Sequence, residues 1–205
     1  MTISKLAPSK RVEGRWLAFL EDGTILRLGE NEVVQFALYA GKKLDEEETA
    51  ALLNSAQRSA WKEKAIELLS RKPQSRKELE RRLREWEAGE GETAAICDRM
   101  EELGYLNDAA YAEQVVRRYS ARGFGEKKLR DELYRRGIPR ELWDEALNQA
   151  EDPAGAIDDF VAKKLAGKTP DRKELKKVSD ALARRGYSWS DISAALRRYG
   201  VQCGE

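Results

Sequence analysis

The residues of this chain with the most evident chemistry are arginine and lysine, which bind anions. They gather in two windows of the sequence. Residues 117–136 hold eight basic and three acidic side chains, a net charge of +5, and residues 163–185 hold nine and three, a net charge of +6. The whole chain carries 38 basic and 37 acidic residues, so both windows are local excesses of positive charge. Such windows predict contact with a polyanion or with an acidic protein surface.

The basic residues have helical spacing. Lys128 and Arg135 are seven positions apart, and so are Lys177 and Arg184, which places each pair on one helix face to within about 20°. The sequence therefore predicts a basic stripe in each window, and the alternative is a solvated helix surface without a partner. The residues assigned to the two stripes are Arg117, Arg118, Arg122, Lys127, Lys128, Arg130, Arg135, Arg136, Lys163, Lys164, Lys176, Lys177, Arg184 and Arg185.

Enzymatic chemistry has little support in the sequence. The 205 residues include no histidine, which excludes a serine–histidine triad and histidine metal ligands. Cys97 and Cys203 lie far apart and match no metal-ligand spacing, so we expect two free thiols in a reducing cytosol. Because no nucleophile–base pair and no metal-ligand set can be assembled, the chain is predicted to be neither a hydrolase nor a transferase and to need no cofactor.

One loop offers weaker anion-binding chemistry. The segment Gly123-Phe124-Gly125 precedes a predicted helix, where backbone N–H groups could cradle a phosphate. It lacks the lysine and hydroxyl pattern of a P-loop, so we interpret it as a tight connection between helices. The flanking Arg122 and Lys127 leave an anion contact open at this point.

Targeting and membrane segments are not evident. The longest uninterrupted apolar runs have five residues, at 16–20 and 36–40, whereas a membrane span needs about 18 or more. Residues 1–10 contain no apolar signal-peptide core. We therefore expect a cytoplasmic location and no membrane partner.

The two stripes recur because the sequence repeats. A shift of 49 residues brings Leu129 onto Val178 and the Arg-Arg-Gly at 135–137 onto the same residues at 184–186. A fainter copy lies about 50 residues upstream, and periods of this size are typical of repeat proteins. The predicted domains are an N-terminal β-hairpin extension at 1–30, connecting helices at 31–60, and three-helix repeats at 61–104, 105–150 and 151–205.

Helix boundaries follow from local signals. Asp45 with Glu48 and Ser75 with Glu78 have the spacing of capping boxes, and Asn107 is a candidate N-cap. The other expected boundary residues are Gly137 and Gly186 in left-handed conformation after helices, Pro139, Pro153 and Pro170 in first turns, and Thr169 as a cap.

The first residues differ from the rest. Asp22-Gly23 predicts a two-residue hairpin turn, which pairs Phe19 with Leu26. One face of the hairpin is then predicted to hold Leu17, Phe19, Leu26 and Leu28.

Beyond the hairpin the pattern is helical. Asn31 is expected to cap a helix with Val33, Val34 and Leu38 facing inward. The predicted fold class is all-α: an elongated, curved array of three tandem three-helix repeats, preceded by a short N-terminal β-hairpin and helix.

The central block resembles a known family. The Gly-Tyr-Leu-Asn-Asp-Ala-Ala-Tyr-Ala of 104–112, Arg118, the Gly-Phe-Gly of 123–125 and the Leu-Tyr-Arg-Arg-Gly-Ile of 133–138 resemble the signature of the bacterial RecX family. The upstream Ser-Arg-Lys-Glu-Leu of 75–79 fits the same pattern. The resemblance extends from about residue 30 to about residue 200.

This resemblance implies a function. Members of the family bind the RecA–DNA filament along its groove and modulate strand exchange, ATP turnover and coprotease activity, usually as inhibitors; they are not enzymes, and some bind DNA directly. The resemblance therefore implies a monomeric, non-catalytic regulator whose partners are the RecA filament and single- and double-stranded DNA. The sequence leaves open whether the basic stripes meet RecA or DNA. The alternative hypothesis is an independent DNA-binding helical-repeat protein that acts through its stripes without an essential protein partner.

Overall fold

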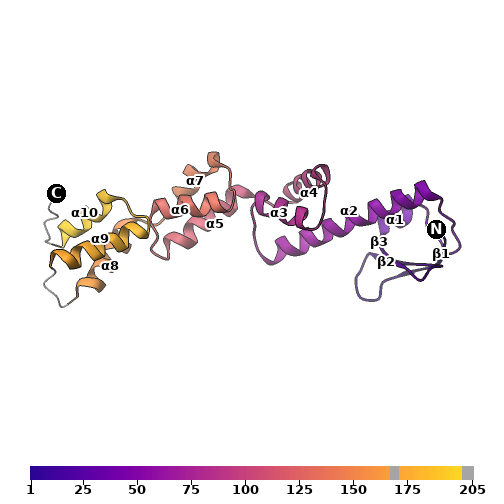
Figure 1. The fold of residues 1–205 in the computed structure, drawn as a ribbon, viewed down its shortest axis with the longest axis horizontal. Helices are drawn as coiled ribbons and strands as arrows, with labels where there is room; N and C mark the ends of the chain where they lie inside the picture. The colour runs from indigo at the N-terminus through magenta and orange to yellow at the C-terminus, as the bar shows by residue number, and fades with distance from the viewer. Residues whose placement is uncertain (167–170, 200–205) are drawn as a thin grey trace. The chain divides into compact units, whose positions relative to one another are not determined.

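The computed structural model describes residues 1–166 and 171–199. The described residues form a three-stranded sheet followed by helices (Figure 1). The predicted all-α class, with a small β element before three three-helix repeats, is confirmed. Thr169, Pro170 and Cys203, to which the sequence assigned roles, lie outside the described residues.

The structure packs into two compact units. The first unit combines Met1–Lys72 with Arg82–Glu102, and the second combines Pro73–Arg81 with the chain from Leu103 onward. Helix α3 (Arg76–Glu85) therefore begins in the second unit and ends in the first.

The N-terminal sheet has one strand more than the predicted hairpin. Strands β1 (Ile3–Pro8), β2 (Arg15–Leu20) and β3 (Ile25–Gly29) are antiparallel, in the order β1-β2-β3. Strand β1 escaped prediction because only Ile3 among its residues is buried, so its sequence has no clear alternation of apolar and polar residues.

The predicted hairpin register is wrong by one residue. Phe19 pairs with Ile25 rather than with Leu26. The loop has three residues instead of two, because the Leu20 N–H donates to the Thr24 carbonyl at 2.9 Å and Gly23 adopts a left-handed φ of +85°. A type I turn followed by a left-handed glycine is the usual three-residue hairpin loop.

This shift exchanges the two faces of the sheet. The buried face carries Ala18, Leu20 and Leu28, with Trp16 and Leu26 packed beside them, so the predicted face of Leu17, Phe19, Leu26 and Leu28 is incorrect. Helix α2 covers this face (Figure 1), and its Leu52 belongs to the same core.

Helix α1 (Glu30–Gln35) also differs from the prediction. Its N-cap is Gly29 rather than Asn31, because the Glu32 carboxylate accepts the Gly29 N–H at 2.9 Å. Val34 is 79% exposed, so it does not face inward, whereas Leu38 is buried just beyond the helix.

Helix α2 (Glu46–Arg71) is one continuous helix that begins at the predicted capping box. The Glu48 N–H donates to the Asp45 carboxylate at 2.8 Å. The second half of α2 packs on α4 (Glu90–Glu102), and the Trp61 indole N–H donates to the Trp86 carbonyl at 3.0 Å. Helices α2, α3 and α4 form the first repeat.

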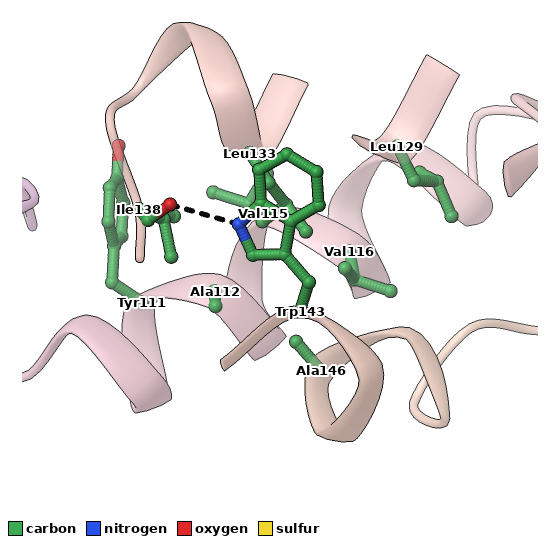
Figure 2. Packing of buried hydrophobic residues seen from close by; sticks show 9 residues of the cluster. All are labelled: Tyr111, Ala112, Val115, Val116, Leu129, Leu133, Ile138, Trp143 and Ala146. Carbon is green, nitrogen blue, oxygen red and sulfur yellow. Dashed lines mark hydrogen bonds between the residues drawn. The ribbon is translucent and has the colours of Figure 1, made fainter. Parts of the chain in front are cut away.

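The second repeat is built from α5 (Asp108–Ser120), α6 (Glu126–Arg135), the 3-10 turn η1 (Arg140–Leu142) and α7 (Trp143–Leu147). Asn107 caps α5 as predicted, with its side chain accepting the Ala110 N–H at 2.9 Å. Figure 2 shows the core, in which the Trp143 indole N–H donates to the Ile138 carbonyl at 2.9 Å. The buried residues of this core are Tyr111, Ala112, Val115, Val116, Leu129, Leu133, Ile138, Trp143 and Ala146.

The third repeat has the same plan in α8 (Pro153–Leu165), α9 (Arg172–Arg184) and α10 (Trp189–Arg198). Pro153 occupies the first turn of α8, as predicted. The third helix packs on the first in both repeats, α7 on α5 and α10 on α8. The residues aligned by the 49-residue shift lie in equivalent cores, with Val178 buried like Leu129.

Successive repeats join through the Arg-Arg-Gly loops. The Gly125 N–H donates to the Arg185 carbonyl at 2.9 Å and the Lys127 N–H to the Gly186 carbonyl at 3.1 Å, so the loop after α9 completes the N-terminus of α6. In the same way the Ser75 hydroxyl, at the start of α3, donates to the Arg136 carbonyl at 2.5 Å.

These contacts explain two sequence features. Gly137 and Gly186 adopt left-handed φ angles of +66° and +89°, as predicted. Because the Gly125 and Lys127 N–H groups are occupied by carbonyls of the chain itself, they are not available to a phosphate, and the segment Gly123–Gly125 is a tight connection.

Candidate partner-binding surface

The basic residues at the end of α5 are exposed. Arg117 forms an ion pair one helical turn back with Glu113, at 2.5 Å. Arg118 is exposed and has no ion pair within the described residues. The guanidinium of Arg122 lies over the rings of Tyr119 and Phe124, at 5.5 and 5.7 Å from their centroids.

The stripe predicted on α6 converges on one buried carboxylate. The side chain of Glu132 is 5% exposed and accepts a hydrogen bond from Arg135 at 2.6 Å and another from Arg136. The Lys128 ammonium lies 3.9 Å from its other oxygen. Three predicted stripe residues are therefore paired within the protein, and Lys127 is exposed beside them.

The pKa of Glu132 reflects this arrangement. Burial raises the pKa of the carboxyl, but the hydrogen bonds from Arg136 and Arg135 outweigh it and lower the pKa below its ordinary value. Glu132 is therefore ionised at neutral pH and cancels part of the positive charge of α6.

Arg136 is a structural residue as well as a charged one. It is half-buried, with the Tyr119 hydroxyl 3.4 Å from its guanidinium and the Tyr119 ring 5.4 Å away. Burial lowers its pKa, but the bond to Glu132 and those to the tyrosines raise it above its ordinary value, so it stays charged. Arg130 is also paired, with Glu126 at 2.8 Å and Asp144 at 3.3 Å.

The basic residues of the third repeat have a different environment. Lys163, Lys176, Lys177 and Arg184 are exposed, and none has an ion pair in the part of the chain that the structure describes. The exposed Lys164 ammonium lies 5.8 Å from the centroid of the Phe160 ring.

Arg185 is the counterpart of Arg136 and is likewise half-buried. Its guanidinium lies 4.6 Å from the centroid of the Phe160 ring and donates to the Gly123 carbonyl at 3.3 Å. It therefore joins the third repeat to the second rather than facing solvent with Arg184.

A groove of about 420 Å³ lies between α8 and α9. Lys177 and Arg184 border it from α9, and Lys164 borders it from α8. Among the described residues, its lining is Phe160, Lys164, Leu165, Glu174, Lys177, Val178, Ala181 and Arg184.

The sequence-based site omitted two residues that decide its charge. Glu132 cancels part of the positive charge of the stripe on α6, and the 49-residue shift places Ala181 at the equivalent position of α9. The signal was present, because Glu132 lies four residues after Lys128 and three before Arg135, which is the spacing of helical ion pairs.

Exposed aromatic side chains lie on the same repeats. Tyr134 on α6 is 69% exposed and Trp189 on α10 is 63% exposed. By contrast, Tyr187 is buried and Tyr119 is half-buried.

The described residues contain no group of three or more histidine, cysteine, aspartate or glutamate side chains placed to bind a metal ion. Nor does any of their helices have the length and apolarity needed to cross a membrane. Cys97 is buried and forms no disulfide within the described residues.

Comparison with known proteins identifies the fold. Residues 62–100 match the first three-helix domain of RecX, residues 107–147 the second and residues 155–196 the third. The chain belongs to the RecX family. The family's curated members are named regulatory proteins, and the chain is thus a member of a family of regulators.

Individual RecX relatives support this assignment. The regulatory protein RecX of Streptococcus pneumoniae (strain Hungary19A-6) is 28% identical over 208 residues, which cover 100% of this chain and 80% of the relative. RecX of Pseudomonas entomophila (strain L48) is 34% identical over 134 residues, covering 64% of this chain and 86% of the relative.

Solved RecX structures have the same fold. A crystal structure of regulatory protein RecX superposes with a TM-score of 0.76 at 25% identity and covers 96% of this chain and 98% of its own. RecX from Lactobacillus salivarius superposes with a TM-score of 0.65 at 23% identity over 70% of this chain and 97% of its own.

Proposed function

We propose that this chain is a non-catalytic regulator that binds the RecA–DNA filament along its groove and inhibits the recombinase, ATPase and coprotease activities of RecA. Family membership provides the regulatory role. The observation that carries the binding proposal is the set of exposed cations on the third repeat, Lys163, Lys176, Lys177 and Arg184, which have no ion pair within the described residues.

These cations are suited to binding because the cost of using them is small. A cation already paired within the protein must lose that partner before it can contact another anion, whereas an exposed, unpaired cation loses only water. On the second repeat, Arg118, Arg122 and Lys127 extend the same kind of surface.

The test is the DNA-dependent ATPase of RecA. The chain is titrated into RecA assembled on single-stranded DNA, and ATP hydrolysis is followed together with filament length by electron microscopy. We expect inhibition at amounts of the chain below those of RecA, since a protein lying along the filament affects more than one protomer. Unchanged ATPase, strand exchange and filament length would refute the proposal.

The exposed cations also support a second candidate, an independent DNA-binding protein with no essential protein partner. Its test is binding to single- and double-stranded DNA without RecA at several salt concentrations. A negative slope of log affinity against log salt, about 0.7 to 0.9 in magnitude per phosphate contact, together with no effect on RecA, would favour this candidate.

Further features complete the proposal. We propose that the chain acts as a monomer in the cytoplasm, without a cofactor and without a membrane partner. The absence of histidine from the sequence supports the non-catalytic role. Sedimentation of the purified chain tests the monomeric state.

A further inference from the structure

The internal repeat contains a template for ligand binding. In the second repeat the Glu132 carboxylate lies among Lys128, Arg135 and Arg136. The 49-residue shift aligns these cations with Lys177, Arg184 and Arg185. The same shift aligns Glu132 with Ala181, so the third repeat retains the cations and lacks the carboxylate.

The structure has open space at this position. Ala181 is one of the residues that line the groove of about 420 Å³ between α8 and α9, and Lys177 and Arg184 line it too. The third cation, Arg185, lies against Phe160, another lining residue. Lys164 adds a positive charge from α8, and among the described lining residues Glu174 is the one acidic side chain.

We propose that this groove binds a carboxylate of a partner protein, from a glutamate or aspartate in an acidic segment, at the position that Glu132 occupies in the second repeat. The inference rests on the proposed function and deepens it, because it names the chemistry of the partner surface that the third repeat meets.

The lining favours an acidic side chain over a nucleic-acid phosphate. The template is itself a glutamate, whose side chain is 5% exposed where it is held. Phe160, Leu165 and Val178 give the groove apolar walls that suit the methylene groups of a glutamate. Where a glutamate has methylene groups next to its charge, a nucleic-acid phosphate has ester oxygens and a hydrophilic sugar. A bound phosphate would therefore leave the apolar walls without an apolar partner.

The experiment tests the groove by placing a carboxylate in it through the substitution Ala181→Glu. A short fluorescent peptide rich in glutamate is titrated into the full-length chain and into Ala181→Glu, with binding followed by fluorescence anisotropy. The variant copies the second repeat, so its carboxylate should pair with Lys177 and Arg184, and we expect affinity for the peptide to fall about tenfold. Circular dichroism checks that the helices are retained.

Three controls separate charge from shape. Ala181→Gln fills the groove equally without a charge and should lose less affinity than Ala181→Glu. Lys177→Gln should weaken peptide binding without filling the groove at all. The same peptide with glutamine at each glutamate should bind wild-type chain weakly.

Definite outcomes would overturn the inference. It fails if Ala181→Glu binds the acidic peptide as tightly as wild type does, or if the glutamine peptide binds equally well. It also fails if the wild-type chain binds a DNA oligonucleotide but not the peptide and Ala181→Glu reduces the DNA affinity, because the groove is then a phosphate site. Inhibition of the RecA ATPase without peptide binding refutes the groove alone, whereas peptide binding without any effect on RecA refutes the proposed function.

Discussion

The second and third repeats have the same spacing of basic residues, but most of these residues are paired in one repeat and exposed in the other. On α6, Lys128, Arg135 and Arg136 surround a buried carboxylate. On α9, Lys177 and Arg184 are exposed beside an open groove. Two stripes that look alike in the sequence therefore differ in how much charge they offer to a partner.

The difference teaches that counting charges along a helix does not measure a binding surface. One exchange between glutamate and alanine, at 132 and 181, decides whether the neighbouring cations stabilise the fold or remain available. In the second repeat these cations are paired within the protein, whereas in the third repeat Lys177 and Arg184 are exposed.

The largest expected effect concerns the loop between these repeats. In Gly186→Ala, the new Cβ collides with the backbone nitrogen of Lys128, and the residue has a left-handed φ of +89°. We expect the free energy of unfolding, from urea titration, to fall by about 3 kcal/mol, because a backbone must move and strain is added.

Two glycines provide matched controls for this prediction. Gly137→Ala has a left-handed φ of +66° and meets the Lys77 side chain, with Cγ at 2.6 Å and Cβ at 2.7 Å, but no backbone atom closer than 3.8 Å, so it should cost less, about 2 kcal/mol. Gly155→Ala in α8 meets nothing within 4 Å and should raise stability by about 0.5 to 1 kcal/mol. Equal losses at Gly137 and Gly186 would show that the two loops are joined with the same strength.

A second prediction concerns the buried carboxylate. Glu132→Gln should lower the free energy of unfolding by about 2 kcal/mol, because half-buried Arg136 loses its charged partner. The control is Glu113→Gln, which breaks the more exposed pair with Arg117 and should cost about 0.5 kcal/mol. Losses of the same size would mean that Glu132 is as well solvated as Glu113.

The binding prediction compares matched triple variants. Replacing Lys176, Lys177 and Arg184 with glutamine should raise the concentration of chain that halves the RecA ATPase about tenfold, or about 1.4 kcal/mol. Replacing Arg117, Arg130 and Arg135, which are paired within the second repeat, should raise it less than about threefold. The reverse order would place the contact surface on the second repeat.

The smallest expected effect is a dependence of stability on pH. Because folding lowers the pKa of Glu132 below its ordinary value of 4.5, the stability that it contributes is complete above that pH and is lost as pH falls through the folded-state pKa. As the pH falls below 4.5, the free energy of unfolding of the wild-type chain should therefore fall more steeply than that of Glu132→Gln. Parallel curves for the two proteins would contradict this assignment.

Local signals predicted several helix boundaries, although the cap predicted at Asn31 was wrong. The capping boxes at Asp45 and Ser75 and the left-handed glycines at 137 and 186 depend on residues close together in the sequence, and the structure contains them. The hairpin register was wrong because a two-residue and a three-residue loop differ only in the conformation of Gly23, which the residue type alone does not fix.

The binding surface was harder to predict for a tertiary reason. The spacing placed Lys128 and Arg135 on one face, yet the burial of Glu132 beside them depends on how the helix packs in its repeat. The separation of Arg136 from the exposed stripe has the same origin, because Tyr119 comes from α5. The contrast between Glu132 and Ala181 was visible in the sequence repeat. Only the structure showed that Glu132 is buried among cations and that Ala181 lines an open groove.

The Arg-Arg-Gly loop of the third repeat also has a consequence for synthesis on the ribosome. Helix α6 leaves the ribosome before residues 185 and 186, whose carbonyls accept the N–H groups of Gly125 and Lys127 at its N-terminus. These N–H groups therefore gain their partners only when the third repeat has emerged and folded. Helix α9 needs no such help, since the side chain of Asp171 accepts the Glu174 N–H at 2.7 Å.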